Sequence, residues 1–193
     1  MAGPARYTAV LDACVLYPVS VADALLSLAV AGLYAAKWTA RIEREWIVSL
    51  ERQRPELAGR LDTRRAQMRA AVPDWEVPAT ACESLMPCLS LPDPGDTHVL
   101  SAALVGHADC IVTSNLRDFP PVDVAPFGID VLHPDDFIVA QLDLDEFATL
   151  AAFREMRARK KNPPLDPESF TKALERNGLV ATASRLRAAA ALI

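Results

Sequence analysis

Short apolar runs alternate along this chain with longer stretches of helical spacing. Residues 7–12, 109–115 and 127–134 are short and almost continuously apolar, which predicts buried strands. Residues 20–35, 39–54 and 96–105 repeat apolar positions at helical spacing, and Asp96 and Gly106 stand where the last of these helices should begin and end. Apolar strands that alternate with helices predict an α/β fold, with a parallel sheet covered by helices.

The other segments are predicted to be mainly helical. Pro55 suits the first position of a further helix over residues 55–71. From Pro134 onward the pattern is helical, with a break over residues 157–166. We therefore expect an α/β domain over residues 1–140 and a helical extension over residues 141–193. The apolar positions of the last stretch are Phe170, Leu174, Leu179 and Leu186.

Composition narrows the class of protein. A chain of 193 residues that is 51% hydrophobic can form one sizeable core and a short appendage. It has no run of about 18 uncharged apolar residues, so no membrane span is expected. The N-terminus lacks a basic region followed by an apolar segment, which predicts a cytoplasmic protein. The scattered cysteines form no C-x-x-C pair and are expected to be small core residues; they are Cys14, Cys82, Cys88 and Cys110.

The net charge of −5 is unevenly distributed. Residues 1–153 carry 11 Lys/Arg and 21 Asp/Glu, a net charge of −10. Residues 154–193 carry 9 and 4, a net charge of +5. This asymmetry predicts an acidic site region and a basic tail, although a basic tail can also be a solvated helix face.

Four carboxylates stand at positions that suggest chemistry. Asp12 ends the first apolar run, Glu45 lies in a predicted helix, Asp96 begins another helix, and Asp118 follows the 109–115 strand. Ligands of open parallel sheets bind beyond the carboxyl ends of the strands. If the strands before Asp12 and Asn115 are neighbours, their polar ends converge.

Convergence of carboxylates has an electrostatic cost. Two such charges about 4 Å apart repel by roughly 4 kcal/mol at an effective dielectric constant near 20. A cluster must therefore share protons or hold a cation, and oxygen-only ligands favour Mg²⁺ or Mn²⁺. Each acid also has a simpler possible role. Asp12 can be bonded to backbone amides, Asp96 can be a helix cap, and Asp118 can be a turn residue. Glu45 can be a surface residue no different from Glu43 or Glu51.

Four segments together resemble the PIN-domain nucleases, particularly the toxin subunits of bacterial VapC-type toxin–antitoxin systems. This resemblance covers roughly residues 7–140. It implies a Rossmann-like PIN domain, an α/β/α sandwich with a mostly parallel sheet, followed here by C-terminal helices. The segments are "VLDACVLYP", "ARIEREWIVSL", "LPDPGDTHVLSAALVGHADCIVTSNLRDFP" and "GIDVLHPDDF".

The resemblance also implies an activity. Such proteins are Mg²⁺- or Mn²⁺-dependent endoribonucleases that leave a 3′-hydroxyl and a 5′-phosphate. The partners expected on this basis are an RNA substrate, a cognate antitoxin and a second copy of the chain in a homodimer, with no membrane. Two alternatives stay open: a PIN-fold binding or scaffold module without catalysis, and a DNA-directed nuclease or phosphatase with a similar acidic site.

The resemblance assigns residues to that site. Asp12, Glu45 and Asp96 match the three central metal-binding acids of the family. Asn115 stands where many members have Asp, so Asp118 is favoured as the fourth catalytic acid and metal ligand, with Asn115 as a polar orienting group. The other substrate-positioning candidates are Thr113, Ser114, Asp93 and Arg44.

Two basic groups are candidates for RNA contacts. The first surrounds the acidic residues, and for most of its members pairing with nearby Glu or Asp is the simpler explanation; it comprises Arg41, Arg44, Arg52, Arg54, Arg64, Arg65 and Arg69. The second comprises Arg157, Arg159, Lys160 and Lys161, and simple solvation is the alternative there. His98 lies two residues after Asp96 and is a weaker candidate for proton transfer.

Overall fold

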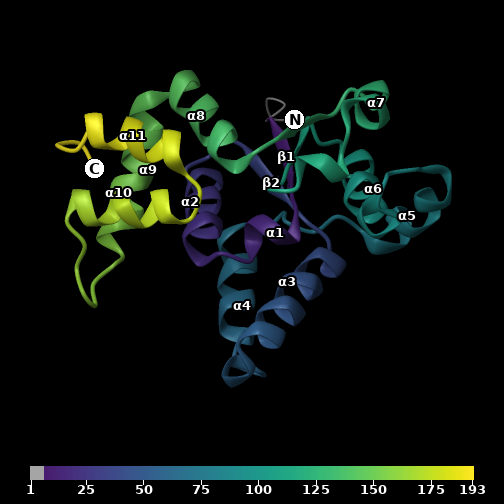
Figure 1. The fold of residues 1–193 in the computed structure, drawn as a ribbon, viewed down its shortest axis with the longest axis horizontal. Coiled ribbons are helices and arrows are strands. Elements are labelled where there is room, and N and C mark those ends of the chain that lie inside the picture. The colour runs from purple at the N-terminus through teal and green to yellow at the C-terminus, as the bar shows by residue number, and fades with distance from the viewer. Residues whose placement is uncertain (1–6) are drawn as a thin grey trace. The chain divides into compact units, whose positions relative to one another are not determined.

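The computed structural model describes residues 7–193 and divides the chain into two compact units. The first contains the segment that ends at Tyr17 together with Tyr34–His133, and the second contains Pro18–Leu33 and Pro134–Ile193. The second unit therefore includes a helix from the N-terminal part of the chain (Figure 1). The division into domains after residue 140 stays a prediction of the sequence.

A four-stranded, entirely parallel sheet forms the centre of the first unit. Its strands are β1 (Thr8–Leu11), β2 (Ala35–Lys37), β3 (Cys110–Val112) and β4 (Asp130–Leu132), in the spatial order β2-β1-β3-β4. The last three residues of β1 and all of β3 have no exposed surface, as expected for parallel strands covered on both faces. The predicted α/β fold is confirmed, but β2 was missed because its residues continue an alanine-rich helical pattern.

The strand order creates a site at one edge of this sheet. The chain leaves β1 to form β2 on one side and returns to form β3 on the other side. Such a reversal of direction opens a crevice beyond the carboxyl ends of the two adjacent strands. Asp12 follows β1, and residues 113–118 follow β3. The expected convergence of these two segments therefore has a topological basis.

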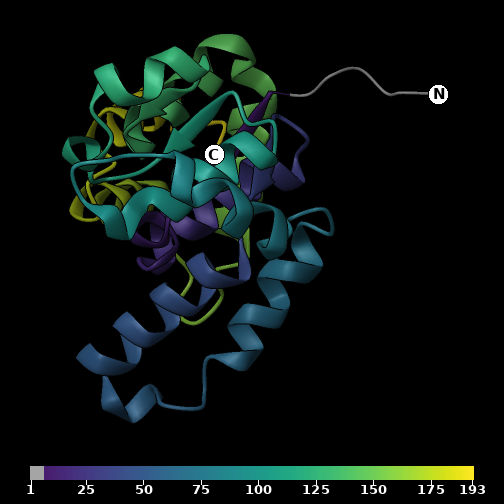
Figure 2. The same cartoon turned by 90° about the vertical axis from the view of Figure 1, so that its right-hand side faces the viewer.

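Helices α3 (Ala40–Gln53) and α4 (Asp62–Ala71) lie side by side in the first unit (Figures 1 and 2). Thr39 caps α3 by accepting a 3.1 Å hydrogen bond from the Ile42 N–H. The predicted helix over 55–71 is wrong in its first part, where a 3₁₀ turn over Pro55–Leu57 precedes α4. Gly59 has a φ of 69° in the connection, a left-handed conformation that ends the turn.

The remaining helices of this unit are α1 (Ala13–Leu16), α5 (Ala79–Leu85), α6 (Thr97–Val105) and α7 (Pro121–Val124). Helix α6 was predicted within a residue of its observed bounds, and it ends at Gly106 as expected. It packs against β1 and β3, and the residues of its first two turns are almost wholly buried. This packing fixes the start of α6, and with it Asp96, relative to the sheet.

Five helices form the second unit: α2 (Val19–Val30), α8 (Pro134–Leu144), α9 (Glu146–Ala158), α10 (Pro167–Arg176) and α11 (Val180–Ala188). The predicted helical character after Pro134 is confirmed, including the break between α9 and α10. The predicted apolar stripe is buried throughout; its members Phe170, Leu174, Leu179 and Leu186 are at most 2% exposed. No helix among residues 7–193 is long and apolar enough to cross a membrane.

The surface corrects one prediction about the cysteines. Cys82 and Cys110 are buried core residues, but Cys88 is exposed and Cys14 is only partly covered.

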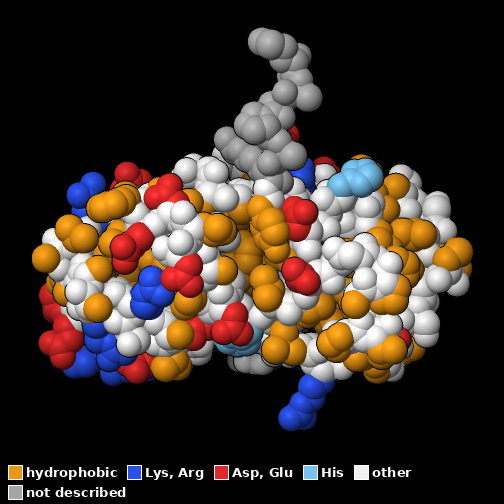
Figure 3. Space-filling model, turned by 90° about the horizontal axis from the view of Figure 1, so that it is seen from above, with side chains coloured by type: hydrophobic (Ala, Val, Ile, Leu, Met, Phe, Trp, Pro, Cys, Tyr) orange, Lys and Arg blue, Asp and Glu red, His pale blue; other side chains and the backbone are white. Residues whose placement is uncertain are grey.

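Large apolar side chains also reach the surface, and on the face seen in Figure 3 they are interspersed with acidic ones. Scattered exposed apolar residues of this kind are normal on soluble folds.

Candidate active site

Asp12 stands at the carboxyl end of β1 and is 6% exposed. Its Oδ1 accepts a 2.6 Å hydrogen bond from the Ala13 N–H, which caps the short helix α1. Its Oδ2 accepts a 2.7 Å hydrogen bond from the Thr113 hydroxyl and a 3.1 Å contact from the Cys14 thiol. A carboxylate has about four acceptor positions, so these three donors leave room for a further ligand. Asp12 is thus held in place from both strands without being saturated.

The segment after β3 is built around the Thr113 hydroxyl. Thr113 is fully buried, and its Oγ1 also accepts a 3.0 Å hydrogen bond from the Asn115 N–H. The Ser114 N–H donates to the Cys14 Sγ at 3.2 Å. The side chains of Ser114 and Asn115 are exposed, whereas Asp118, in the 3₁₀ turn Leu116–Asp118, is half-buried. These contacts hold the backbone of the segment beside Asp12.

Asp96 precedes α6 but does not act as its cap. Its side chain makes no capping hydrogen bond, and instead Asp93 accepts a 2.7 Å hydrogen bond from the Gly95 N–H in the turn before it. Burial, and then the negative charges of Asp12, Asp118 and Asp93 in that order, together raise the pKa of Asp96 to about 6. The structure therefore brings the other three carboxylates within electrostatic range of Asp96.

Within the described residues, the contacts of the Glu45 carboxylate are with an arginine and a histidine. Its carboxylate contacts the Arg41 Nε at 3.1 Å and the His98 Nε2 at 3.0 Å. Burial raises the pKa of Glu45, but His98 and Arg41 together outweigh burial and lower the pKa below its usual range. His98 is 3% exposed, and its Nδ1 lies 2.7 Å from the carbonyl oxygen of Gly95. His98 thus connects Glu45 to the turn that carries Asp96.

The structure separates Glu45 from the two other glutamates of α3. Glu43 is 2% exposed and pairs with Arg69 on α4. Glu51 accepts a 3.0 Å hydrogen bond from the Gly59 N–H. Both therefore stabilise the α3–α4 connection. Only Glu45 of the three lies near the Asp93–His98 turn.

Most of the candidate arginines of this unit have protein partners. Arg64 donates to the carbonyls of Leu16 and Tyr17 and lies 4.5 Å from the Trp46 ring centroid. Arg44 is exposed, and within residues 7–193 it has no hydrogen bond or ion pair. Arg52 is likewise exposed and has no ion pair within residues 7–193. The other four form ion pairs: Arg41 with Glu45, Arg54 with Glu56, Arg65 with Asp62, and Arg69 with Glu43.

The donors suit a hard divalent cation, although the side chains are not gathered around one point. No group of three or more Asp, Glu, His or Cys side chains in residues 7–193 is arranged to hold a metal ion. The chemistry nevertheless fits, because carboxylate oxygens are the donors that Mg²⁺ and Mn²⁺ prefer. The raised pKa of Asp96 agrees with this, because the negative charges around Asp96 disfavour its ionised form.

A comparison with known protein families decides the class of this site. A model of the PIN domain matches residues 8–117, which is more than half of the chain and includes every element that carries Asp12, Glu45 and Asp96. The chain belongs to the PIN-domain family. A second model, described as the VapC50 C-terminal domain, matches residues 134–188. This PIN domain is therefore followed by a segment that itself resembles a known domain.

The chain is also similar to a known mycobacterial protein. It is 47% identical over 79 residues to "Putative ribonuclease VapC50" of Mycobacterium tuberculosis, and these residues are 41% of this chain and 47% of that protein. The match thus spans about half the length of that relative. No solved structure matches the chain. The comparisons support the predicted PIN fold and the helical C-terminal extension.

One polar contact of this PIN domain was not predicted from the sequence. Cys14 was expected in the core, but its Sγ lies within 3.2 Å of the Thr113 Oγ1 and connects the two strand ends. The available signal was its position two residues after Asp12, in the turn that begins α1. Spacing within one segment could not identify the partner, which is 99 residues away in the sequence.

Proposed function

We propose that this PIN domain is a metal-dependent endoribonuclease that hydrolyses RNA phosphodiester bonds, acting as the toxin of a toxin–antitoxin pair. The observation that carries this proposal is the electrostatic effect of Asp12, Asp118 and Asp93 on Asp96, at the crevice beside β1 and β3. The name of the mycobacterial relative supports RNA as the substrate. The expected products are a 3′-hydroxyl and a 5′-phosphate.

In this proposal Asp12, Asp96 and Asp118 hold the cation, and Glu45 is the fourth carboxylate of the metal site. A bound Mg²⁺ or Mn²⁺ would neutralise these carboxylates and supply Lewis acidity toward a phosphate oxygen and the attacking water. Thr113 and Cys14 fix the orientation of Asp12 through its Oδ2. His98 fixes Glu45, and Ser114 and Asn115 offer exposed polar groups to the scissile phosphate.

The RNA backbone needs positive partners near this acidic crevice. Arg44 is suited to that role because it is exposed and has no hydrogen bond or ion pair within the described chain. Asp93 has a supporting role, since its Oδ1 shapes the Pro94–Asp96 turn through the Gly95 N–H. The cognate antitoxin and the homodimer remain part of the proposal as partners expected for a VapC-type protein.

The decisive experiment measures cleavage of a labelled single-stranded RNA with Mg²⁺ or Mn²⁺ and with EDTA. We expect cleavage with either ion, none in EDTA, and a loss of at least about 100-fold in Asp12→Asn and Asp96→Asn, because each removes a charge that the cation requires. Asp62→Asn is the matched control, since the Asp62 side chain is 75% exposed and pairs with Arg65 on its own helix.

Parallel assays separate the alternatives. Cleavage of DNA or of small phosphoesters in preference to RNA would favour a different phosphodiesterase. Mn²⁺ binding is measured by calorimetry on the same samples. A folded wild-type protein that neither binds Mn²⁺ nor cleaves any of these substrates would favour a scaffold module and overturn the proposal.

A further inference from the structure

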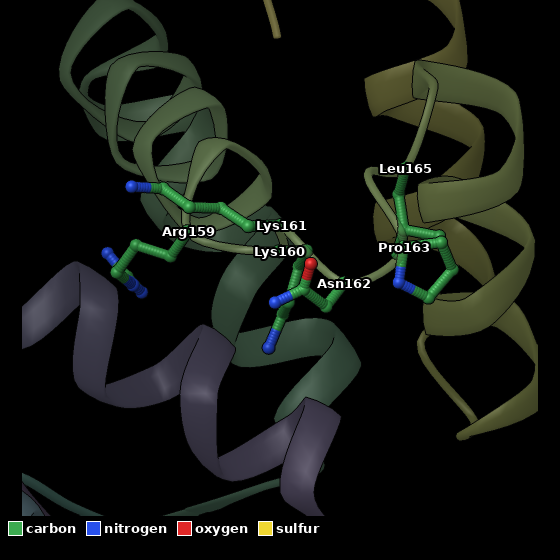
Figure 4. Close-up of a pocket in the computed structure, with 6 residues that line it drawn as sticks. All are labelled: Arg159, Lys160, Lys161, Asn162, Pro163 and Leu165. Atoms are coloured by element: carbon green, nitrogen blue, oxygen red, sulfur yellow. The ribbon is translucent and has the colours of Figure 1, made fainter.

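A basic hollow lies in the second unit, in the connection between α9 and α10 (Figure 4). Its volume is about 570 Å³, within the range of sites that hold small polar groups. The hollow is lined by three consecutive cationic residues and then by the chain that leads to α10. These lining residues are Arg159, Lys160, Lys161, Asn162, Pro163 and Leu165.

The positive charge of this hollow exceeds the negative charge that faces it. Asp23 on α2 accepts hydrogen bonds from both Arg159 and Lys160, so one carboxylate is shared by two cations. Arg159 also donates to the Ser27 hydroxyl at 2.7 Å. Figure 4 shows the Arg159 and Lys160 side chains extending toward the neighbouring helix, whereas Lys161 extends in a different direction. Lys161 is exposed and has no side-chain partner within residues 7–193.

The nearby acidic residues of α10 are occupied elsewhere. Asp166 caps that helix by accepting from the Ser169 N–H at 2.8 Å, and Glu168 pairs with Lys172. Arg157, which belongs to the same basic run, has a structural role instead. It donates to the carbonyls of Leu165 and Ile193 and so anchors the end of the loop. The hollow is therefore held in shape by Arg157 and made basic by the three residues that follow.

We propose that this hollow binds backbone phosphates of the RNA substrate. Arg and Lys beside an exposed Asn amide form a set of hydrogen-bond donors for phosphate oxygens. None of the six described residues that line the hollow is aromatic, so they offer no stacking to bases and recognition is independent of sequence. The choice of RNA rests on the proposed function, and it is favoured because the single Asp23 carboxylate leaves the cations of the hollow only partly neutralised, which suits a polyanion.

The shared carboxylate makes the proposal testable by opposite changes. Asp23→Asn removes the carboxylate that competes with RNA phosphates for Arg159 and Lys160. RNA should therefore bind more tightly, and the salt dependence of binding should become steeper. In Lys161→Gln, binding should weaken several-fold, and the slope of log K against log salt should fall by about 0.7 for each lost phosphate contact. Matched controls are Glu168→Gln and Lys172→Gln, which make the same charge changes on α10.

Binding of a fluorescent single-stranded RNA is measured in EDTA, so that no metal-dependent cleavage occurs, with circular dichroism as a check on folding. Larger effects for D23N and K161Q than for their controls support the proposal. Equal effects overturn it while leaving RNA cleavage by the wild type intact, which separates it from the proposed nuclease function. Displacement of RNA by a poly-glutamate peptide at equal charge would overturn the assignment to RNA and point to an acidic protein partner. Absence of RNA binding by the wild type in EDTA would overturn the proposal for the hollow, and cleavage with Mg²⁺ or Mn²⁺ would still test the nuclease separately.

Discussion

The Thr113 hydroxyl donates a 2.7 Å hydrogen bond to the Oδ2 of Asp12, and this bond joins residues 101 positions apart in the sequence. Both groups are buried at the carboxyl ends of adjacent parallel strands. A buried carboxylate needs such donors, and a donor on a neighbouring strand also fixes its direction. The contact therefore links the folding of the sheet to the arrangement of the proposed catalytic acids.

Replacing Thr113 tests this link. Thr113→Val keeps the shape but removes the donor to Asp12, so we expect RNA cleavage to fall by about 10- to 100-fold, as is common for groups that orient metal ligands. Thr113→Ser keeps the hydroxyl and should retain most of the activity. Initial cleavage rates at saturating Mn²⁺ are the measurement, and equal rates in both variants would contradict the orienting role.

Cys14 offers a prediction about reactivity. Burial, together with the nearby negative charge of Asp12, raises the pKa of the Cys14 thiol to about 12. The thiol therefore stays protonated near neutral pH and is a poor nucleophile. We expect alkylation by iodoacetamide at about pH 8 to modify the exposed Cys88 well before Cys14. Peptide mass spectrometry over time measures both, and faster modification of Cys14 would contradict this assignment.

The central strands could be predicted because of their composition. β1 and β3 are buried on both faces, so their residues are apolar without interruption and leave a clear pattern. β2 has only three residues, Ala35–Lys37, and continues the composition of the preceding helix. The break at Gly59 was likewise hidden within a helical pattern that begins with Pro55. Short elements are fixed by packing and turn geometry, which spacing alone does not reveal.

The residues of the candidate site were also only partly predictable from the sequence. Asp12 and Asp96 could be selected because a carboxylate in an apolar run and one after a Pro-Gly turn are unusual. Selecting Glu45 from among three glutamates required the family resemblance, and its contact with His98 emerged only in the structure. Long-range side-chain contacts depend on how elements pack, and the order of residues does not contain that geometry.

The stability of the protein should depend on Asp96 and pH. The pKa of Asp96 is about 6 in the folded protein, above its ordinary value of 3.8, so the folded state binds this proton more strongly than the unfolded state does. The free energy of unfolding should therefore fall as pH rises through this window. Above it, Asp96→Asn should be more stable than the wild type in EDTA, and the difference should shrink toward about pH 4. Urea unfolding at several pH values measures this, and a difference that is independent of pH would contradict it.

Asp135 provides a prediction for the helical unit. Its two carboxylate oxygens accept hydrogen bonds of 2.8 Å from the Ala181 and Thr182 N–H groups, so it caps the start of α11 from another helix. Asp135→Ala removes both bonds and leaves the buried Thr182 N–H without this acceptor, so we expect a loss of about 1–3 kcal/mol in the free energy of unfolding. Asp136→Ala is the matched control, because Asp136 is the next residue along α8 and its side chain is exposed. Denaturant unfolding measures both, and equal losses would exclude the capping role.

His98 is expected to act on activity through Glu45. Its two ring nitrogens face the Gly95 carbonyl and the Glu45 carboxylate, so it can hold the Asp96 turn and α3 together. His98→Ala should reduce cleavage by about 10- to 100-fold and weaken Mn²⁺ binding, because Glu45 then turns toward Arg41 alone. His98→Gln keeps one donor and should recover part of both losses. Calorimetry measures the affinity for Mn²⁺ and separates this orienting effect from a general loss of stability. If His98 were purely structural, His98→Ala would change the unfolding curve and leave the affinity of the folded protein for Mn²⁺ unchanged.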